Sequence, residues 1–393
     1  MEFKNGKPIV YLDNAATTKP LPEVIEKATT IMENYYNPSA AYDLASYVKE
    51  EVEQARQYVA NSINAQPNEI FFTSGGTEAD NWALKATLKP GDHLITSSIE
   101  HKAILNTAKY LESIGVKVTY LPADRVGLVK LEDVKRAIRP NTKLISIMLI
   151  NNEIGCASDF YGIGEIAKKH NILYHSDAVQ AYGKYILNMS FMPFDMVSLS
   201  AHKINGLKGT GALYVRGGKI DSFIHGGGQE SGLRSGTENV VGIAAMGRAA
   251  AELDKAEIHR RWENVSYLYN TLIDNIIHTD FLSYKEPVEG YSGYVLNPYT
   301  NPYIMSIIFP GLRGEQIARL LDANGICVST GSACNAHSAE SSHVLKAIGV
   351  SDENANSSIR VSLSHNNTPE EIEYFIKVLK QVITQLKGIK KEE

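Results

Sequence analysis

Between residues 69 and 218, short apolar segments alternate with segments of helical periodicity. The apolar segments are rich in Ile, Leu and Val and nearly continuous in hydrophobicity, which is typical of a mainly parallel sheet covered on both faces. They lie at 69–75, 93–98, 117–123, 143–150, 172–178, 195–203 and 211–218, with helical stretches at 77–88, 102–115 and 163–171. Repeated βαβ units of this kind predict an α/β fold whose large domain has three layers joined by right-handed crossovers.

The pattern changes near Glu252, where a second and smaller domain is expected. An amphipathic stretch at 259–277 leads into a segment rich in Pro, Gly and Tyr, and shorter strand and helix patterns then continue to the end of the chain. We therefore predict a large domain at 16–255 and a smaller α+β domain formed by 1–15 together with 256–393.

The composition argues against several classes of protein. Lys and Arg number 39 against 44 Asp and Glu, so the net charge is −5 and we expect no direct binding of nucleic acid. We expect no secretory signal peptide, because the N-terminal segment has no apolar core flanked by a cleavage site. We expect no membrane partner, because no apolar run approaches the ~18–20 residues that span a bilayer. Three cysteines, Cys156, Cys327 and Cys334, are too few for a disulfide framework, so the expected location is the reducing cytoplasm.

A Gly-rich turn, TSGGTEADN at 73–81, follows the first predicted strand and opens a helix. Its glycines would let the backbone approach an anion, the N–H groups of the first helical turn would point at that anion, and Thr77 would add a hydroxyl. Such a turn is by itself more often only a turn, and it matches neither the Walker loop nor the GxGxxG fingerprint.

Two further residues stand at predicted strand ends, Asp177 in HSDAVQ and Lys203 in SLSAHK. A lone Asp in this position is about as often a helix N-cap, and a lone Lys is usually a solvated surface group. Together with Thr77, however, they supply an amine for a Schiff base, an acid for a pyridinium nitrogen and a cradle for a phosphate. Because open α/β sheets bind ligands at the carboxyl ends of their strands, the combination predicts a site for pyridoxal 5'-phosphate (PLP).

With these motifs the chain resembles the NifS/IscS type of cysteine desulfurase, within the class V aminotransferase family, which implies the PLP-dependent transferase fold type I. The resemblance covers almost the whole chain in order. It is carried by YLDNAATT (11–18), NPS (37–39), TSGGTEADN (73–81), EHKAIL (100–105), NNEIG (151–155), HSDAVQ (175–180), SAHKINGLKG (200–209), GGGQ (226–229), LRSGTENV (233–240), TGSAC (330–334), SSHVLKAIG (341–349) and SSIRVSL (357–363).

The resemblance implies a role for each matching residue in binding PLP. Lys203 would form the Schiff base, Asp177 would pair with the pyridinium nitrogen, and His101 would stack on the ring and move protons. Gln180 would hydrogen-bond the phenolic oxygen, with Asn152 beside it. The phosphate would be held by Gly76, Thr77, Ser200 and His202, with Thr237 reaching across from the second subunit of a homodimer.

The resemblance also implies how the substrate, L-cysteine, is held and converted. Arg360 would clamp the substrate carboxylate, helped by Asn37 and Asn152. Cys334, in a loop at about 328–342 rich in small residues, would take the sulfur as a persulfide and leave alanine. The sulfur would pass to an acceptor protein, such as an iron–sulfur scaffold or a thiolation enzyme, and we expect no metal ion at the site.

Without the resemblance, Cys334 is better explained as an incidental buried residue. Cys327 lies in the apolar run 326–330 and fits that explanation. Cys156, which follows NNEIG, could be structural or catalytic.

Four positions depart from the pattern of the family. Tyr42 stands near the usual His, and Ser231 stands where GGGQERG has an Arg, both close to the expected substrate entrance. Leu207 replaces the Pro of INGPKG, and Ser364 replaces a Gly. Two alternatives therefore stay open: a PLP-dependent lyase or transferase for another amino acid (selenocysteine, a sulfinate or a pathway-specific C–S or C–N substrate), and a non-catalytic binding protein.

Overall fold

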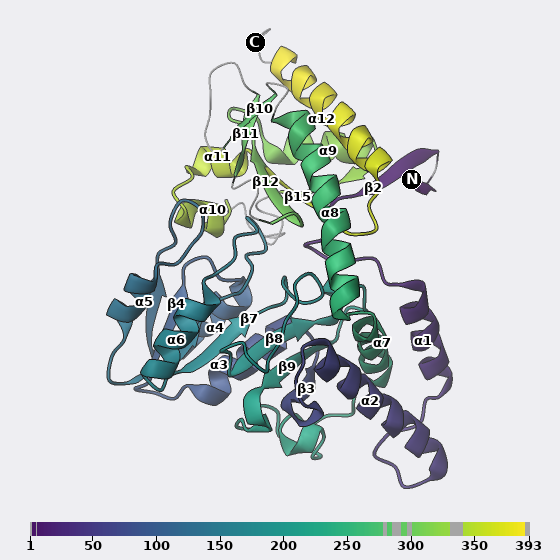
Figure 1. The fold of residues 1–393 in the computed structure, drawn as a ribbon, viewed down its shortest axis with the longest axis vertical. Coiled ribbons are helices and arrows are strands. Elements are labelled where there is room, and N and C mark those ends of the chain that lie inside the picture. The colour runs from purple at the N-terminus through teal and green to yellow at the C-terminus, as the bar shows by residue number, and fades with distance from the viewer. Residues whose placement is uncertain are drawn as a thin grey trace.

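The computed structural model describes residues 2–4, 6–277, 281–284, 292–296, 301–330 and 341–389. Two larger sheets organise this part of the chain, and Figure 1 shows them toward opposite ends of the long axis of the molecule. The helix α8 (Lys255–Ile276) runs from one region to the other.

All seven predicted strand segments form strands of one sheet, which confirms the predicted α/β fold. They are β3 (Ile70–Thr73), β4 (His93–Ser97), β5 (Lys117–Leu121), β6 (Thr142–Ser146), β7 (Leu173–Asp177), β8 (Met196–Ser200) and β9 (Gly211–Val215). Their order is β3-β9-β8-β7-β6-β4-β5. Strands β4 to β8 run parallel to one another, and β9 is antiparallel to both of its neighbours.

Helices cover both faces of this sheet, as the βαβ pattern predicts. One face is covered by α3 (Gly76–Thr87) and α4 (Lys102–Ser113). The apolar cluster on the other face includes residues of α1 (Pro22–Glu33), α2 (Asp43–Ser62), α5 (Leu131–Ala137), α6 (Phe160–Lys169) and α7 (Val240–Ala251). Phe71 and Phe72, neighbours in β3, belong to the two different clusters because successive strand side chains point to opposite faces.

The second sheet belongs to a separate apolar cluster. Its order is β10-β11-β12-β15-β14, with β10 (Leu282–Tyr284), β11 (Gly293–Leu296), β12 (Ile304–Ile308), β14 (Ser329–Thr330) and β15 (Ser358–Ser362). Residues of α8, α9 (Gly314–Ala323) and α12 (Pro369–Ile389) pack in the same cluster, which also takes in Val10 and Leu12. The short helices α10 (His343–Ala347) and α11 (Asp352–Asn356) lie beside this sheet (Figure 1).

The apolar run 326–330 is divided between two sheets. Its first half is β13 (Ile326–Cys327), which pairs in parallel with β2 (Lys7–Tyr11) in a small sheet completed by β1 (Glu2–Lys4). Its second half is β14, which pairs with β15. Among the residues described, no helix has the length and hydropathy needed to cross a membrane.

The carboxyl ends of β7 and β8 lie next to each other and position the predicted strand-end residues. β7 ends at Asp177, which lies opposite Ser198 in the register. β8 ends at Ser200 and continues into the turn η2 (Ala201–Lys203). Ligands of open α/β sheets bind at this edge, so the fold directs both residues toward one site.

Candidate active site

A cavity of about 430 Å³ lies between the carboxyl edge of the seven-stranded sheet, the segment after β2, and strands β14 and β15. The predicted site residues that line it are Gly76, Thr77, His101, Asn152, Asp177, Gln180, Ser200, His202, Lys203 and Arg360. Asp13, Ala15, Ala16, Asp80, Met148, Val179 and Ser329 also line it, although the sequence analysis did not single them out. Asn37 and Thr237 do not line this cavity, and Cys334 lies outside the described residues.

Lys203 is held at the cavity by main-chain oxygens of the N-terminal segment. Its Nζ donates to the carbonyl oxygen of Ala15 at 2.5 Å and to that of Ala16 at 2.8 Å. A ligand that carries an aldehyde can therefore reach the amine inside the cavity.

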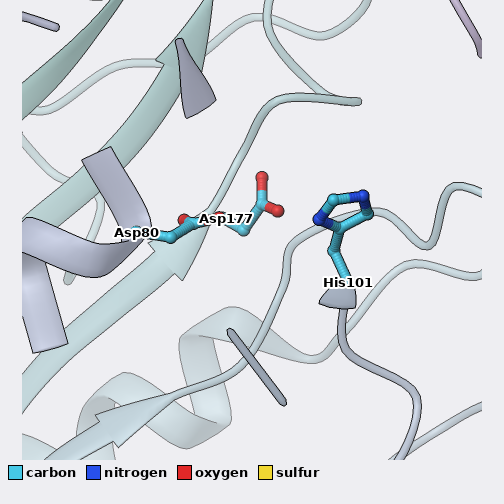
Figure 2. A group of neighbouring side chains, drawn as sticks. All are labelled: Asp80, His101 and Asp177. Atoms are coloured by element: carbon cyan, nitrogen blue, oxygen red, sulfur yellow. The ribbon is translucent and has the colours of Figure 1, made fainter. Parts of the chain in front are cut away.

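Asp177 lies between Asp80 and His101, with its carboxylate directed toward the His101 ring (Figure 2). It accepts a hydrogen bond from the backbone N–H of Val179 at 2.9 Å. Burial raises the pKa of Asp177, while the interactions with His101, the backbone N–H of Val179 and the Lys203 amine act in the opposite direction. A cationic ring nitrogen bound beside this carboxylate would stabilise its charged form.

His101 is the N-cap of α4, so its imidazole ring both caps this helix and faces the cavity. Its Nδ1 accepts the backbone N–H of Ala103 at 3.2 Å. Burial lowers the pKa of His101, so the neutral ring carries its proton on Nε2. Nε2 is therefore the atom of His101 that can donate a proton.

Asp80, on the sheet-facing side of α3, is a site residue that the sequence analysis missed. It is 1% exposed, and its Oδ1 has no hydrogen-bond partner among the described residues. His175 Nε2 lies 3.8 Å from that oxygen, but burial lowers the pKa of His175 to about 3, so this ring is neutral. The signal available in the sequence was an acidic residue on the inward face of a helix that begins at the Gly-rich turn.

The start of α3 forms a cradle for an anion. An added Cβ at Gly76 would lie 2.7 Å from Val179 Cγ2, so no larger residue fits without displacing Val179. The first N–H groups of a helix have no partner within it and carry partial positive charge. Around them lie the hydroxyls of Thr77 and Ser200 and the imidazole of His202, whose pKa is lowered to about 4 by burial and by nearby lysines.

Arg360, in the middle of β15, faces the cavity from the second sheet. Its Nη1 donates to the carbonyl oxygen of Asn152 at 2.9 Å and its Nη2 donates to Asp13 Oδ1 at 2.8 Å. Its Nε is buried and has no partner among the described residues. A buried guanidinium with an unused N–H is suited to a carboxylate ligand.

The residues around the cavity fit PLP. An amine, a buried acid and an anion cradle line one space, and the unpartnered Oδ1 of Asp80 lies behind the acid. Asp80, His101 and Asp177 also offer atoms of the kinds that bind metal ions, within 4.8 Å of one another. The lysine and the cradle, which a metal ion would not use, favour the organic phosphate.

The two cysteines in the described residues do not line the cavity. The thiol of Cys156 is buried and donates to the carbonyl oxygen of Gly127 at 3.2 Å. Burial raises the pKa of Cys156 to about 12, which suppresses its thiolate and favours a structural role.

Comparisons with known proteins agree with this chemistry. A model of the family described as aminotransferase class-V matches residues 10–375. Cysteine desulfurase IscS from Clostridium botulinum is 45% identical over 382 residues, covering 96% of this chain and 94% of that protein. A solved structure described as a NifS-like protein superposes with a TM-score of 0.87 at 38% identity, covering 96% of this chain and all of the other. SspA, solved in complex with cysteine, gives a TM-score of 0.77 at 36% identity, covering 91% of this chain and 99% of its own.

Proposed function

Because this chain belongs to the class V aminotransferase family and is a cysteine desulfurase of the IscS/NifS type, we propose that its cavity holds PLP on Lys203 and that Cys334 receives the sulfur of L-cysteine. The family uses PLP. The observation that carries the assignment is the meeting of the Lys203 amine, the Asp177 carboxylate and the start of α3 in one cavity.

Each of these groups has a part of PLP to bind. Lys203 Nζ would bond the aldehyde carbon, Asp177 would bind the ring nitrogen, and Gln180 and Asn152 would lie beside the phenolic oxygen. Gly76, Thr77, Ser200 and His202 would hold the phosphate. When bound in this way, PLP withdraws electrons from the substrate and so makes its Cα–H acidic and its sulfur transferable.

The protein would bind the substrate through Arg360. The unpartnered Nε and the second hydrogen of Nη2 offer two parallel donors for the carboxylate of L-cysteine, and Asp13 holds the guanidinium in place. The Lys203 amine lies at the cavity and would serve as the base that takes the Cα proton of the substrate. His101 Nε2 would exchange a proton with the substrate on the face of the PLP ring that His101 covers.

Sulfur transfer is assigned to Cys334. Its thiolate attacks the substrate sulfur, so an S–S bond forms and the C–S bond breaks with its electron pair remaining on carbon. Protonation of that carbon gives alanine, and the persulfide on Cys334 passes to an acceptor protein such as an iron–sulfur scaffold or a thiolation enzyme. The thiol must first lose its proton, so the rate should rise with pH through the thiol pKa.

We propose that the active form is a homodimer. Pro38 and Ser39, beside Asn37, line a second hollow together with Glu230, Ser231 and Glu238, close to Thr237. Asn37 and Thr237 thus belong to one surface region away from their own chain's cavity. Large apolar side chains are exposed nearby on α1, α2 and the segment between them: Met32, Tyr35, Tyr42, Leu44 and Tyr47. If a second subunit covers this surface, Asn37 and Thr237 of the first subunit would lie at the cavity of the second subunit.

Two apolar clusters pack on the faces of the seven-stranded sheet and a third packs with the second sheet, which supports the division into a domain at 16–255 and one formed by 1–15 with 256–393. Because Cys156 and Cys327 are free thiols, we propose the cytoplasm as the location.

The assignment is tested by treating the purified holoenzyme with L-cysteine and analysing products by mass spectrometry. Wild-type protein should form alanine and carry one added sulfur on Cys334, and Cys334→Ala should do neither. Cys327→Ala is the matched control and should behave as wild type. Alanine formed at the wild-type rate by Cys334→Ala would exclude Cys334 as the acceptor.

A further inference from the structure

Lys184 is a buried lysine behind the cavity whose partner is not an acid. The residue is 6% exposed, and its Nζ donates to Oε1 of Gln180 at 2.8 Å. The ammonium also lies 5.7 Å from the ring centroid of Tyr303. Buried lysines are nearly always paired with a carboxylate, so an amide partner requires an explanation.

The turn after β7 is built to bring these two side chains together. Residues 178–185 form helix-like turns, with the N–H of Tyr182 bonded to Ala178 and that of Tyr185 to Ala181. Gln180 and Lys184 are four residues apart, which places them on one face of such turns. Gly183 has φ of +73°, and a Cβ there would lie 2.7 Å from Ile204 Cγ2, so glycine is required between them.

Lys184 fixes the orientation of the Gln180 side-chain amide, that is, the positions of its oxygen and its NH₂ group. Oε1 accepts from Lys184, and Nε2 donates to the carbonyl oxygen of Ala15 at 2.9 Å. A flipped amide would set its NH₂ group against the ammonium and its oxygen against the carbonyl, which are two repulsive contacts. The observed orientation leaves one N–H of Nε2 for a ligand.

We propose that Lys184 is a positioning residue that acts through Gln180, fixing the amide so that an N–H group rather than an oxygen faces the phenolic oxygen of the cofactor. This inference rests on the proposed function, because it requires PLP bound at Lys203. A donor to that oxygen stabilises its anionic form and so lowers the pH at which the linkage to Lys203 loses its proton.

Lys184 also carries a charge that could act directly. Burial, followed by the charges of Lys203 and Arg360, lowers the pKa of Lys184 to about 7, so below about that pH its positive charge lies near theirs. The experiment must therefore separate the hydrogen bond to Gln180 from the charge alone.

The readout is the pH midpoint of the absorbance change of the holoenzyme, without substrate. Lys184→Met and Gln180→Leu should each raise the midpoint by about one pH unit. Lys184→Arg, which keeps the donor, should stay near the wild-type midpoint. Lys27→Met is the matched control, since Lys27 also makes one hydrogen bond, 2.6 Å to Glu51, away from the cavity, and should leave the midpoint unchanged.

The double variant Lys184→Met with Gln180→Leu decides the mechanism. A midpoint no higher than that of the larger single variant supports action through Gln180. Additive shifts would mean that Lys184 acts through its charge, and an unshifted Lys184→Met would mean that it does not act at all; either result overturns the proposal. Should Lys184→Met not fold, Lys184→Gln replaces it, because glutamine is polar but one bond too short to keep the contact. If the wild-type protein takes up no PLP, the proposed function fails instead.

Discussion

Arg56 and Glu230 form a bidentate ion pair that joins α2 to the turn before Thr237, with Nη1–Oε2 at 2.7 Å and Nη2–Oε1 at 2.8 Å. Glu230 also accepts the backbone N–H of Phe72 in β3. Glu230 and Ser231 both have positive φ, 48° and 59°, a backbone conformation that few residues other than glycine adopt. The ion pair therefore holds a strained turn against the seven-stranded sheet.

Breaking this pair should destabilise the protein. Both side chains are largely buried, so Arg56→Met leaves an uncompensated carboxylate and should lower the free energy of unfolding by about 3–5 kcal/mol. Urea denaturation followed by circular dichroism measures the change. The double variant Arg56→Met with Glu230→Met should be less damaging than Arg56→Met alone; an equal or larger loss would argue that the charge is not the cause.

Asp80 is expected to act as a neutral acid beside Asp177. Burial and the Asp177 charge raise the pKa of Asp80 well above its usual range. Asp80→Asn, which has the same shape and no charge, should therefore keep PLP affinity close to wild type, whereas Asp80→Ala should weaken it about tenfold. Equilibrium dialysis against PLP measures both. Equal losses in the two variants would mean that an ionised Asp80 is needed.

Glu100 should make the stability of the protein depend on pH. Burial raises its pKa to about 8 despite hydrogen bonds from Ser97 and the backbone of Met148. The carboxyl group of Glu100 loses its proton above about pH 4.5 in the unfolded chain and above about pH 8 in the folded protein. Its contribution to the free energy of unfolding is therefore fully present below about pH 4.5 and is lost as the pH rises from there to about 8. The slope is about −1.4 kcal/mol per pH unit. Glu100→Gln should remove this contribution from thermal midpoints measured between pH 5 and 8, and an unchanged profile would refute the assignment.

Arg360 should control the use of cysteine rather than the binding of PLP. Arg360→Lys keeps the charge but loses the parallel donors, so kcat/KM for alanine formation should fall about 10- to 100-fold. The affinity for PLP, measured by dialysis, should change little. A variant with normal kcat/KM would show that the substrate carboxylate binds elsewhere.

The sequence predicted the elements and residues whose position follows from local pattern. The seven strands were predictable because buried parallel strands are continuous apolar runs, and Lys203 and Asp177 because they stand at strand ends. Asp13 and Lys184 were not predictable. Their partners, Arg360 and Gln180, define their roles, and those contacts exist only once the chain has folded. The division of the run 326–330 between β13 and β14 likewise depends on which strands lie beside it.

The contact between Asp13 and Arg360 spans 347 residues, and Lys203 is held by Ala15 and Ala16. The final strand of the seven-stranded sheet ends at Val215, so this sheet can fold before Arg360 has been synthesised. The substrate side of the cavity has to wait until β15 has left the exit tunnel. A nascent chain that ends before Arg360 would hold Lys203 and Asp177 without the guanidinium proposed to bind the substrate, so the two sides of the cavity are made at different times.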